Sequence, residues 1–337
     1  MRRIQRSFFG AKPKIETLYE KVFETLMVLV YGASGTGKTS LIQCGLRKKM
    51  ADTDWLPILV RRKEHLVTSL QQAVRAAQRT PMPETAPIRP QIRSLYLDHY
   101  KPVYLIFDQF EELFILGDKA EAEAFFRLLF DLLAPGLDCK ILLVVREEYV
   151  AYLSDFEHIV PTLFDNRLRV EWMNAARIKD VLRGTLAYHK IGVEAEEEVL
   201  DTMIRRLRSH QREGIALTTI QLLLDRLWEA AQHAQQKPED PLVFHPELLQ
   251  GLQMEDIMGD FLEDQLKIIA RELGPDKAEL PLTILYTLVS DDGTKRRLDP
   301  GQIRELLPAE LAVSTSDIDF CMQRFEEMRI LRSLGDG

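Results

Sequence analysis

The sequence predicts an α/β protein, in which a parallel sheet wrapped by helices is followed by two smaller, mainly helical domains. Five short apolar runs alternate with helical periodicity as far as Trp172, and helical patterns dominate afterwards. Apolar runs with few polar interruptions are typical of strands buried on both faces, and their alternation with helices indicates βαβ units. We therefore expect a first domain over residues 1–172, a helical domain over 173–253 and a third domain over 254–337.

The first domain has a clear order of elements. Its predicted strands are Met27–Tyr31, Pro57–Val60, Val103–Phe107, Lys140–Val145 and Leu168–Trp172. Its predicted helices are Lys38–Met50, His65–Gln78, Ala120–Leu133 and Glu147–Leu153. A proline-rich run at 80–87 predicts a surface loop.

After Trp172 we expect no further strand until the end of the chain. Asn174 should cap a helix that reaches about His189, and two more helices follow at Glu194–His210 and Leu217–Gln232. The run Lys237–Pro241 contains two prolines and predicts a hinge.

The pattern of the third domain predicts a winged helix. Its predicted helices are Phe261–Leu273, Leu282–Ser290, Pro300–Leu306 and Ser316–Met328. An apolar strand at Ile330–Leu334 then leads into a Gly-Asp-Gly turn, which is typical of the start of a hairpin. The second strand of that wing would lie beyond Gly337, so we expect the wing to be truncated.

Composition narrows the class of protein. Hydrophobic residues make up 46% of the 337 residues and charged residues 28%, which is ordinary for a globular protein of two or three domains. The net charge of −8 disfavours a nucleic-acid partner. The three cysteines are scattered and predict free thiols, neither disulfides nor a zinc site. No apolar run is long enough to cross a bilayer and no signal peptide is visible, so we expect a cytoplasmic protein without a membrane partner.

The segment Gly32–Thr39 fits the phosphate-binding pattern G-x-x-x-x-G-K-[ST]. A predicted strand enters the segment and a predicted helix leaves it, so main-chain N–H groups and the start of the helix should face phosphate oxygens. Lys38 would bridge the β- and γ-phosphates, and the Thr39 hydroxyl would bind Mg²⁺. The expected nucleotide contacts are Gly32, Ser34, Gly35, Thr36, Gly37, Lys38, Thr39 and Ser40. The sequence therefore predicts a P-loop NTPase.

Acidic residues follow the predicted strand Val103–Phe107. Asp108 comes at its carboxyl end, where open α/β sheets bind ligands, and is the expected partner of Mg²⁺. Glu111 and Glu112 are candidates for orienting or deprotonating the attacking water. Many P-loop ATPases place that glutamate directly after the aspartate, but Gln109 stands there, so either glutamate remains a candidate. Their alternative role is capping and surface charge on a new helix.

Arg146 ends the predicted strand Lys140–Val145. It could sense whether the nucleotide carries a γ-phosphate, or form an ion pair with a carboxylate such as Glu111, and the two roles are compatible. The sequence has no Asn-Lys-x-Asp segment of the kind that selects guanine, so ATP and ADP are the expected nucleotides. It also lacks the arginine-rich lid of small-molecule kinases, which disfavours a phosphotransferase.

These residues resemble the STAND class of signal-transducing P-loop ATPases, in particular the bacterial "novel STAND" subgroup, which is related to NACHT proteins. The motifs that carry the resemblance are Ser7–Gly10, Gly32–Leu46, Asp108–Phe114 and Leu222–Trp228. The segment Asp108–Phe114 reads DQFEELF and is the most distinctive of them. The resemblance implies that Phe9 and Gly10 lie against the adenine. The sequence departs from the family pattern in three places. Ala11-Lys12 stands in place of Arg-Glu, no proline precedes Leu217, and the winged-helix histidine that holds the β-phosphate in some relatives is not found.

The resemblance also implies a function. Nucleotide-binding, helical and winged-helix domains would close over ADP at rest, and exchange for ATP would drive self-association and activate an effector, with a role in bacterial defence. Sensor and effector regions are expected outside this chain. The alternative is an AAA+-like ATPase that acts on nucleic acid through its winged helix. Acidic residues outnumber Arg324 and Arg329 on and beside the helix predicted at Ser316–Met328, which disfavours that alternative.

Overall fold

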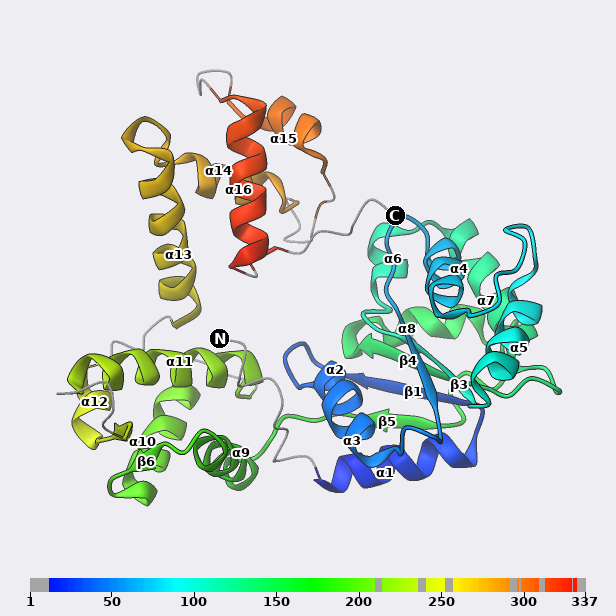
Figure 1. The fold of residues 1–337 in the computed structure, drawn as a ribbon, viewed down its shortest axis with the longest axis horizontal. Coiled ribbons are helices and arrows are strands. Elements are labelled where there is room, and N and C mark those ends of the chain that lie inside the picture. The colour runs from blue at the N-terminus through cyan, green and yellow to red at the C-terminus, as the bar shows by residue number, and fades with distance from the viewer. Residues whose placement is uncertain are drawn as a thin grey trace. The chain divides into compact units, whose positions relative to one another are not determined.

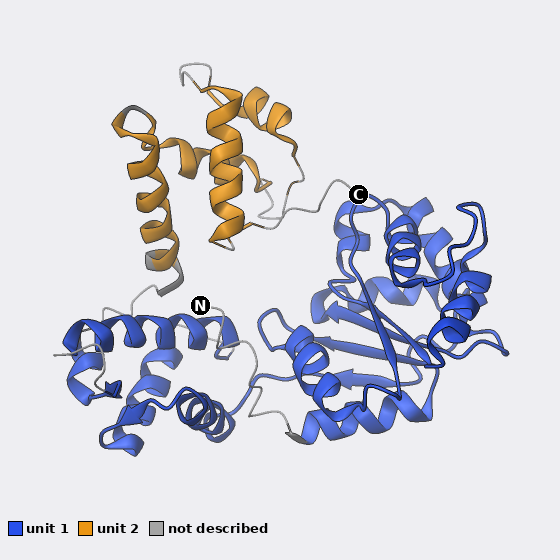
Figure 2. Ribbon diagram, viewed as in Figure 1, with its two compact units in different colours: residues 1–254 blue, residues 255–337 orange. Residues whose placement is uncertain are grey.

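The computed structural model describes residues 12–209, 214–235, 241–251, 257–290, 296, 298–308, 313–328 and 330–331. The chain divides into two compact units, residues 1–254 and 255–337 (Figure 2). Among the described residues, no helix combines the length and the apolar character needed to span a membrane.

The first unit is built on a parallel sheet of five strands, in the order β2-β3-β4-β1-β5 (Figure 1). The strands are β1 (Met27–Gly32), β2 (Leu56–Val60), β3 (Val103–Phe107), β4 (Cys139–Arg146) and β5 (Arg167–Arg169). All five predicted strands are confirmed. Strand β5 is shorter than the predicted Leu168–Trp172, and its last bond to β1 is the one that the Val170 N–H donates to the Tyr31 carbonyl at 2.7 Å.

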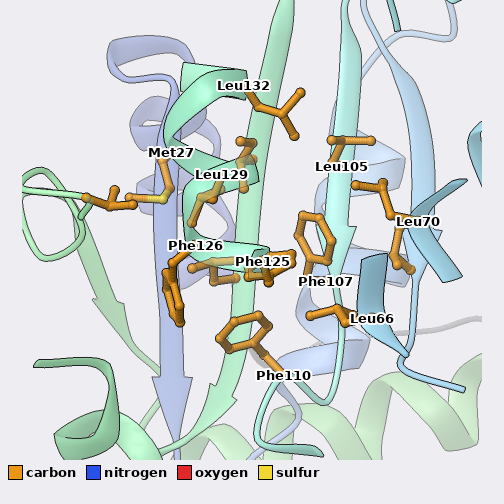
Figure 3. Packing of buried hydrophobic residues seen from close by; sticks show 14 of the residues in the cluster. Met27, Leu66, Leu70, Leu105, Phe107, Phe110, Phe125, Phe126, Leu129 and Leu132 are labelled. Carbon is orange, nitrogen blue, oxygen red and sulfur yellow. The ribbon is translucent and has the colours of Figure 1, made fainter. Parts of the chain in front are cut away.

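One face of the sheet packs against α4 (Leu66–Ala77), α5 (Ile88–His99) and α7 (Lys119–Leu133). Phenylalanines fill the centre of this layer (Figure 3). The rings of Phe107 and Phe125 lie 5.0 Å apart edge to face, and Phe126 stacks on Phe156 at 4.2 Å. Such aromatic pairs add to the free energy gained by burial alone.

The other face is covered by α1 (Lys12–Glu24) and by the helix that follows the phosphate loop. That helix was predicted at Lys38–Met50, and it runs through α2 (Lys38–Ser40), a π-helical stretch at Leu41–Leu46 and α3 (Arg47–Lys49). Strand residues alternate between the two faces, so the first unit has a helix–sheet–helix core.

The predicted loop at 80–87 is confirmed, but four described helices of the first unit were not predicted: α1, α5, the short α6 (Glu112–Leu116) and α12 (Pro246–Gly251). Helix α5 carried a readable signal, since its buried residues Ile88, Ile92 and Leu95 are spaced four and three apart. The predicted helix Glu147–Leu153 consists of a 3₁₀ turn at Glu147–Tyr149 followed by α8 (Val150–Leu153).

The rest of the first unit is mainly helical. It contains α9 (Ala175–Tyr188), α10 (Glu196–Ser209), α11 (Leu217–Ala234) and α12 (Pro246–Gly251). The cap at Asn174 is confirmed, because its side chain accepts the Arg177 N–H at 2.9 Å. The absence of further strands is wrong in one detail: β6 (Gly192–Val193) and β7 (Val243–Phe244) form a parallel pair. Of the hinge predicted at Lys237–Pro241, only Pro241 is described.

The second unit contains the four helices predicted there, as α13 (Ile257–Leu273), α14 (Leu280–Thr287), α15 (Pro300–Leu306) and α16 (Thr315–Glu327). Their buried residues form a core of their own: Ile269, Leu280, Ile284, Ile303, Leu307, Val313, Ile318, Cys321 and Phe325.

The strand predicted at Ile330–Leu334 is wrong where the structure describes it. The N–H groups of Ile330 and Leu331 both point back to the Phe325 carbonyl, at 2.8 and 3.2 Å, so these residues close the end of α16. The remaining residues of that strand, and with them the predicted wing, lie outside the described residues.

Candidate nucleotide site

The candidate site lies at the carboxyl ends of β1, β3 and β4. Strand β1 lies between β4 and β5 in the sheet, and Gly32 at its end is in register with Arg146 at the end of β4. Strand β3 lies on the other side of β4 and ends one residue before Asp108. Parallel pairing therefore places the phosphate loop, Asp108 and Arg146 at the same edge, where α/β sheets bind ligands.

The phosphate loop depends on its glycines. A Cβ atom on Gly32 would lie 2.2 Å from the Val170 carbonyl oxygen, so no larger residue fits there. Gly35 and Gly37 have φ angles of +83° and +91°, in the left-handed region that glycine adopts most readily. The buried Thr36 ties the turn together, since its hydroxyl donates to the Ala33 carbonyl at 2.9 Å.

Lys38 holds its ammonium group inside this loop. Its Nζ donates to the carbonyl oxygens of Gly32 at 2.7 Å and Ala33 at 2.9 Å. Burial lowers the pKa of Lys38, and the nearby Arg146 lowers it further, while Glu111 acts in the opposite direction. A partly desolvated cation at the start of a helix is a strong attractor for phosphate.

Thr39 and Asp108 meet as the sequence predicts. The Thr39 hydroxyl donates to Asp108 Oδ1 at 2.8 Å, and Asp108 is only 3% exposed. Hydroxyl and carboxylate oxygens are ligands that Mg²⁺ prefers, with the remaining positions taken by water and phosphate. The described part of the chain has no cluster of three or more His, Cys, Asp or Glu residues that could hold a metal. The donor set therefore fits Mg²⁺ bound together with a nucleotide.

Glu111 and Glu112 are both buried, at 5% and 9% exposure, so the alternative of surface charge is wrong. The Glu111 side chain makes no capping hydrogen bond. Instead its Oε1 lies 3.1 Å from Arg146 Nε, and its Oε2 accepts the Arg146 main-chain N–H at 3.2 Å. The ion pair proposed between these residues is therefore present. Burial raises the pKa of Glu111, which Arg146 and Lys38 partly oppose.

The sequence did not identify Arg61, which directly follows β2. Its Nε donates to Asp108 Oδ2 at 3.0 Å, and its terminal nitrogen donates to the same oxygen at 2.5 Å. The available signal was an arginine directly after a predicted strand, the position that Asp108 and Arg146 also take after their predicted strands. Recognising it requires the pairing of β2 with β3, in which Val60 lies opposite Phe107.

A second contact that the sequence did not reveal joins the phosphate loop to the first turn of α11. The Leu217 N–H donates to the Gly35 carbonyl at 3.3 Å. A Cβ atom on Gly35 would lie 3.0 Å from the Ala216 Cβ and 3.5 Å from the Trp172 ring. The start of α11 thus forms part of the wall of the loop. Phe9 and Gly10, the expected adenine contacts, lie outside the described residues.

Comparison with protein families agrees with this geometry. The family model for "Novel STAND NTPase 1" matches residues 2–334. The chain belongs to this family. It is therefore a STAND P-loop NTPase, as the motifs at Gly32–Leu46 and Asp108–Phe114 indicated. A search of curated proteins finds no match.

Solved structures share the fold of this STAND NTPase. The ORC2 protein of Aeropyrum pernix, in ADPNP–ADP complexes, is 14% identical with a TM-score of 0.58, covering 98% of this chain and 90% of that one. The A. pernix ORC1 protein in complex with DNA is 16% identical with a TM-score of 0.54, covering 97% and 85%. The Walker-type ATPase paby2304 of Pyrococcus abyssi is 15% identical with a TM-score of 0.50, covering 95% and 90%. At these identities the likeness concerns the fold alone.

Proposed function

We propose that this STAND NTPase binds ATP or ADP with Mg²⁺, hydrolyses ATP slowly, and uses the bound nucleotide to control its self-association. The observation that carries the proposal is the meeting of Lys38, Thr39 and Asp108 at one edge of the sheet, with Thr39 and Asp108 2.8 Å apart. Lys38 would bind the β- and γ-phosphates, and Thr39 and Asp108 would hold Mg²⁺. Magnesium would supply charge neutralisation on the phosphate oxygens.

Slow hydrolysis is supported by the state of the acidic residues. Both oxygens of Glu111 face Arg146, so a Glu111 that served as base would first have to release one of these contacts. Arg146 would respond to a γ-phosphate by exchanging Glu111 for it, which makes the pair a candidate sensor. Glu112 remains the other candidate for positioning the attacking water. An arginine supplied by a neighbouring subunit would then raise the rate by about 10³–10⁵.

The three-domain organisation is part of the proposal. We assign nucleotide binding to residues 1–172, a helical domain to 173–253 and a winged-helix domain to 254–337. In this scheme ADP holds a resting state and ATP promotes self-association, which activates effector regions or partner proteins outside this chain. Membership of a STAND NTPase family supports the nucleotide-binding part of this scheme. The signalling role and its setting in bacterial defence are proposed from the motif resemblance.

The second candidate function is an ATPase that acts on nucleic acid. One observation favours it: the A. pernix ORC1 protein, which shares the fold, was solved in complex with DNA. The charge of α16 opposes it. The helix carries four acidic residues and a single basic one, Arg324, which is already paired with Glu272 and Glu327. Such a helix would repel phosphates. Tight duplex binding that weakens steeply with salt would favour this second function.

The first test is to denature the purified protein and identify any released nucleotide by chromatography, with Lys38→Ala as the comparison. The proposal expects near-stoichiometric ADP from the wild type and none from the variant. A wild type that carries no nucleotide but turns over added ATP steadily would contradict the switch and favour a working ATPase. Light scattering of the nucleotide-loaded protein then tests self-association, since the proposal expects a larger particle with a non-hydrolysable ATP analogue than with ADP.

A further inference from the structure

Among the described residues, Arg61 is the one charged side chain bonded to Asp108 that neither the phosphate-loop pattern nor the DQFEELF segment explains. Both oxygens of the Asp108 carboxylate have partners, because Oδ1 accepts from Thr39 and Oδ2 accepts two hydrogen bonds from the Arg61 guanidinium. The Asp108 side chain is 2% exposed and that of Arg61 is 23% exposed. Water therefore screens this pair less than a surface salt bridge.

The position of Arg61 is fixed from both sides along the chain. Before it, the Val60 carbonyl accepts the Asp108 N–H at 2.9 Å, which locks the end of β2 to the end of β3. After it, Arg62 forms a buried ion pair with Glu121 of α7, and Glu121 also accepts the Leu66 N–H at 2.7 Å. The two neighbouring arginines thus have different roles: Arg62 anchors the segment to the helical layer, and Arg61 is held at the metal-binding carboxylate.

The charge of Arg61 opposes a divalent cation at the same carboxylate. Like charges repel more strongly in a partly buried site than in bulk water, and Mg²⁺ carries two charges. The guanidinium neutralises the charge that would attract Mg²⁺ and also occupies Oδ2. Lys38 is a second cation at the site, but its Nζ bonds to Gly32 and Ala33 and not to Asp108.

We propose that Arg61 competes with Mg²⁺ for Asp108, and so sets how much the metal strengthens nucleotide binding. Arg61 is a positioning residue in this scheme, since it acts through the Asp108 carboxylate. The inference rests on the proposed nucleotide function of the same site. In the metal-free protein the Arg61 guanidinium neutralises the Asp108 carboxylate. Mg²⁺ can bind only when the guanidinium leaves Oδ2, so the free energy needed to break the Arg61–Asp108 pair lowers the apparent affinity for the metal.

The test measures the affinity for mant-ADP, a fluorescent ADP, in EDTA and in saturating Mg²⁺. The dissociation constant in EDTA divided by the dissociation constant in Mg²⁺ gives the factor by which the metal strengthens nucleotide binding. Arg61→Gln should raise this ratio about tenfold, the size expected for loss of a charge-assisted pair, while the affinity in EDTA stays close to wild type. Arg61→Lys, which keeps the positive charge, and Arg127→Gln, which removes an exposed arginine from α7, should leave the ratio near the wild-type value.

A partner variant makes the assignment specific. In an Asp108→Asn background the tenfold effect of Arg61→Gln should disappear, because the carboxylate for which Arg61 and Mg²⁺ compete is gone. If Arg61→Gln does not fold, Arg61→Met replaces it, since methionine keeps an unbranched stem without the charge. Failure of both to fold would overturn the inference and make the pair a structural one.

Three other results also decide the matter. An unchanged metal ratio in Arg61→Gln, with nucleotide still bound, would overturn the role of Arg61 and leave the nucleotide function standing. Equal losses of affinity in EDTA and in Mg²⁺ would mean that Arg61 contacts the nucleotide itself, which also overturns it. A wild type that binds no mant-ADP under either condition would overturn the proposed function together with this inference.

Discussion

The same sheet presents two different environments, a packed face and a charged edge. On the face beneath α7, Phe107, Phe125 and Phe126 are buried among other apolar side chains (Figure 3). At the carboxyl edge, Lys38 and Glu111 are buried enough that their pKa values shift toward the neutral forms. Burial of apolar groups on the packed face stabilises the folded state, whereas burial of charged groups at the edge destabilises it.

This difference teaches that stability and ligand chemistry are separable in this domain. Substitutions on the face should change the free energy of unfolding and leave nucleotide affinity alone, and substitutions at the edge should do the opposite. Failure of either of the first two predictions below would break that separation, and the third compares it with a charge that stabilises a helix in the second unit.

The largest effect is expected on the packed face. Phe126→Ala removes a fully buried ring that stacks on Phe156, and should lower the free energy of unfolding by about 3–5 kcal/mol. Urea denaturation measures the loss, and the affinity for mant-ADP well below the transition should be unchanged. Phe130→Ala, on the same helix but 56% exposed, is the matched control and should cost far less. A large loss of affinity in Phe126→Ala would show that the face and the edge are coupled.

The next effect concerns the edge. Lys38→Ala should weaken nucleotide binding by about a hundredfold or more, because one buried charge-assisted contact to phosphate is lost. It should not lower the melting temperature of the nucleotide-free protein, since burial already disfavours the Lys38 ammonium. Titration with mant-ADP measures the nucleotide affinity, and differential scanning fluorimetry measures the melting temperature. Lys48→Ala, at an exposed position on the next turns of the same helix, should change neither. A marked fall in melting temperature for Lys38→Ala would place the loop lysine among the stabilising groups.

The smallest effect is expected in the second unit, where a charge stabilises a helix in the ordinary way. Asp317 accepts the N–H and hydroxyl of Ser314 at the start of α16, and also Lys277 Nζ at 2.7 Å. These contacts, that with Lys277 first, lower the pKa of Asp317 to about 2 from its ordinary value of 3.8. Asp317→Asn should therefore cost the second unit about 1 kcal/mol at neutral pH.

The pH dependence of that cost follows from the direction of the shift. A carboxyl group whose pKa is lowered by folding stabilises the protein above its unfolded pKa, and this contribution is lost as pH falls through the folded value. The difference between wild type and Asp317→Asn should therefore shrink between about pH 4 and pH 2. Denaturation curves over this range measure it, with the exposed Asp319→Asn as the control. A constant difference across the range would mean that the cost comes from packing and not from the charge.

Local pattern and spacing predicted much of the fold and the centre of the site. Five strands, the longer helices, and the meeting of Thr39 with Asp108 followed from apolar runs, caps and the order of motifs. The features that the sequence did not predict depend on pairing between segments that are distant along the chain. Arg61 reaches Asp108 only because β2 lies beside β3, a neighbour relation that no local pattern encodes. Strands β6 and β7 have two residues each, too few to show an alternation.

The two glutamates illustrate a different limit. Spacing placed Glu111 and Glu112 on the turn after Asp108, but it could not tell whether they face solvent or the interior. That depends on Phe110, whose N–H donates to the Val144 carbonyl at 2.8 Å and draws this turn against the end of β4. Gln109 adopts a φ of +58° to make this turn, which is an uncommon conformation for a residue other than glycine. This main-chain bond, together with the contacts of Glu111 to Arg146, holds the Glu111 side chain in the interior.

The bond between Leu217 and Gly35 gives α11 the geometry of a lever. Its 18 residues form a rod about 27 Å long, and one end of that rod rests on the phosphate loop. A tilt of roughly 10° at the loop would carry the far end of the rod about 5 Å, if the helix moved as a rigid body. A small movement of the phosphate loop that tilted α11 by this angle would therefore move the end of the helix near Ala234 by about the width of a side chain.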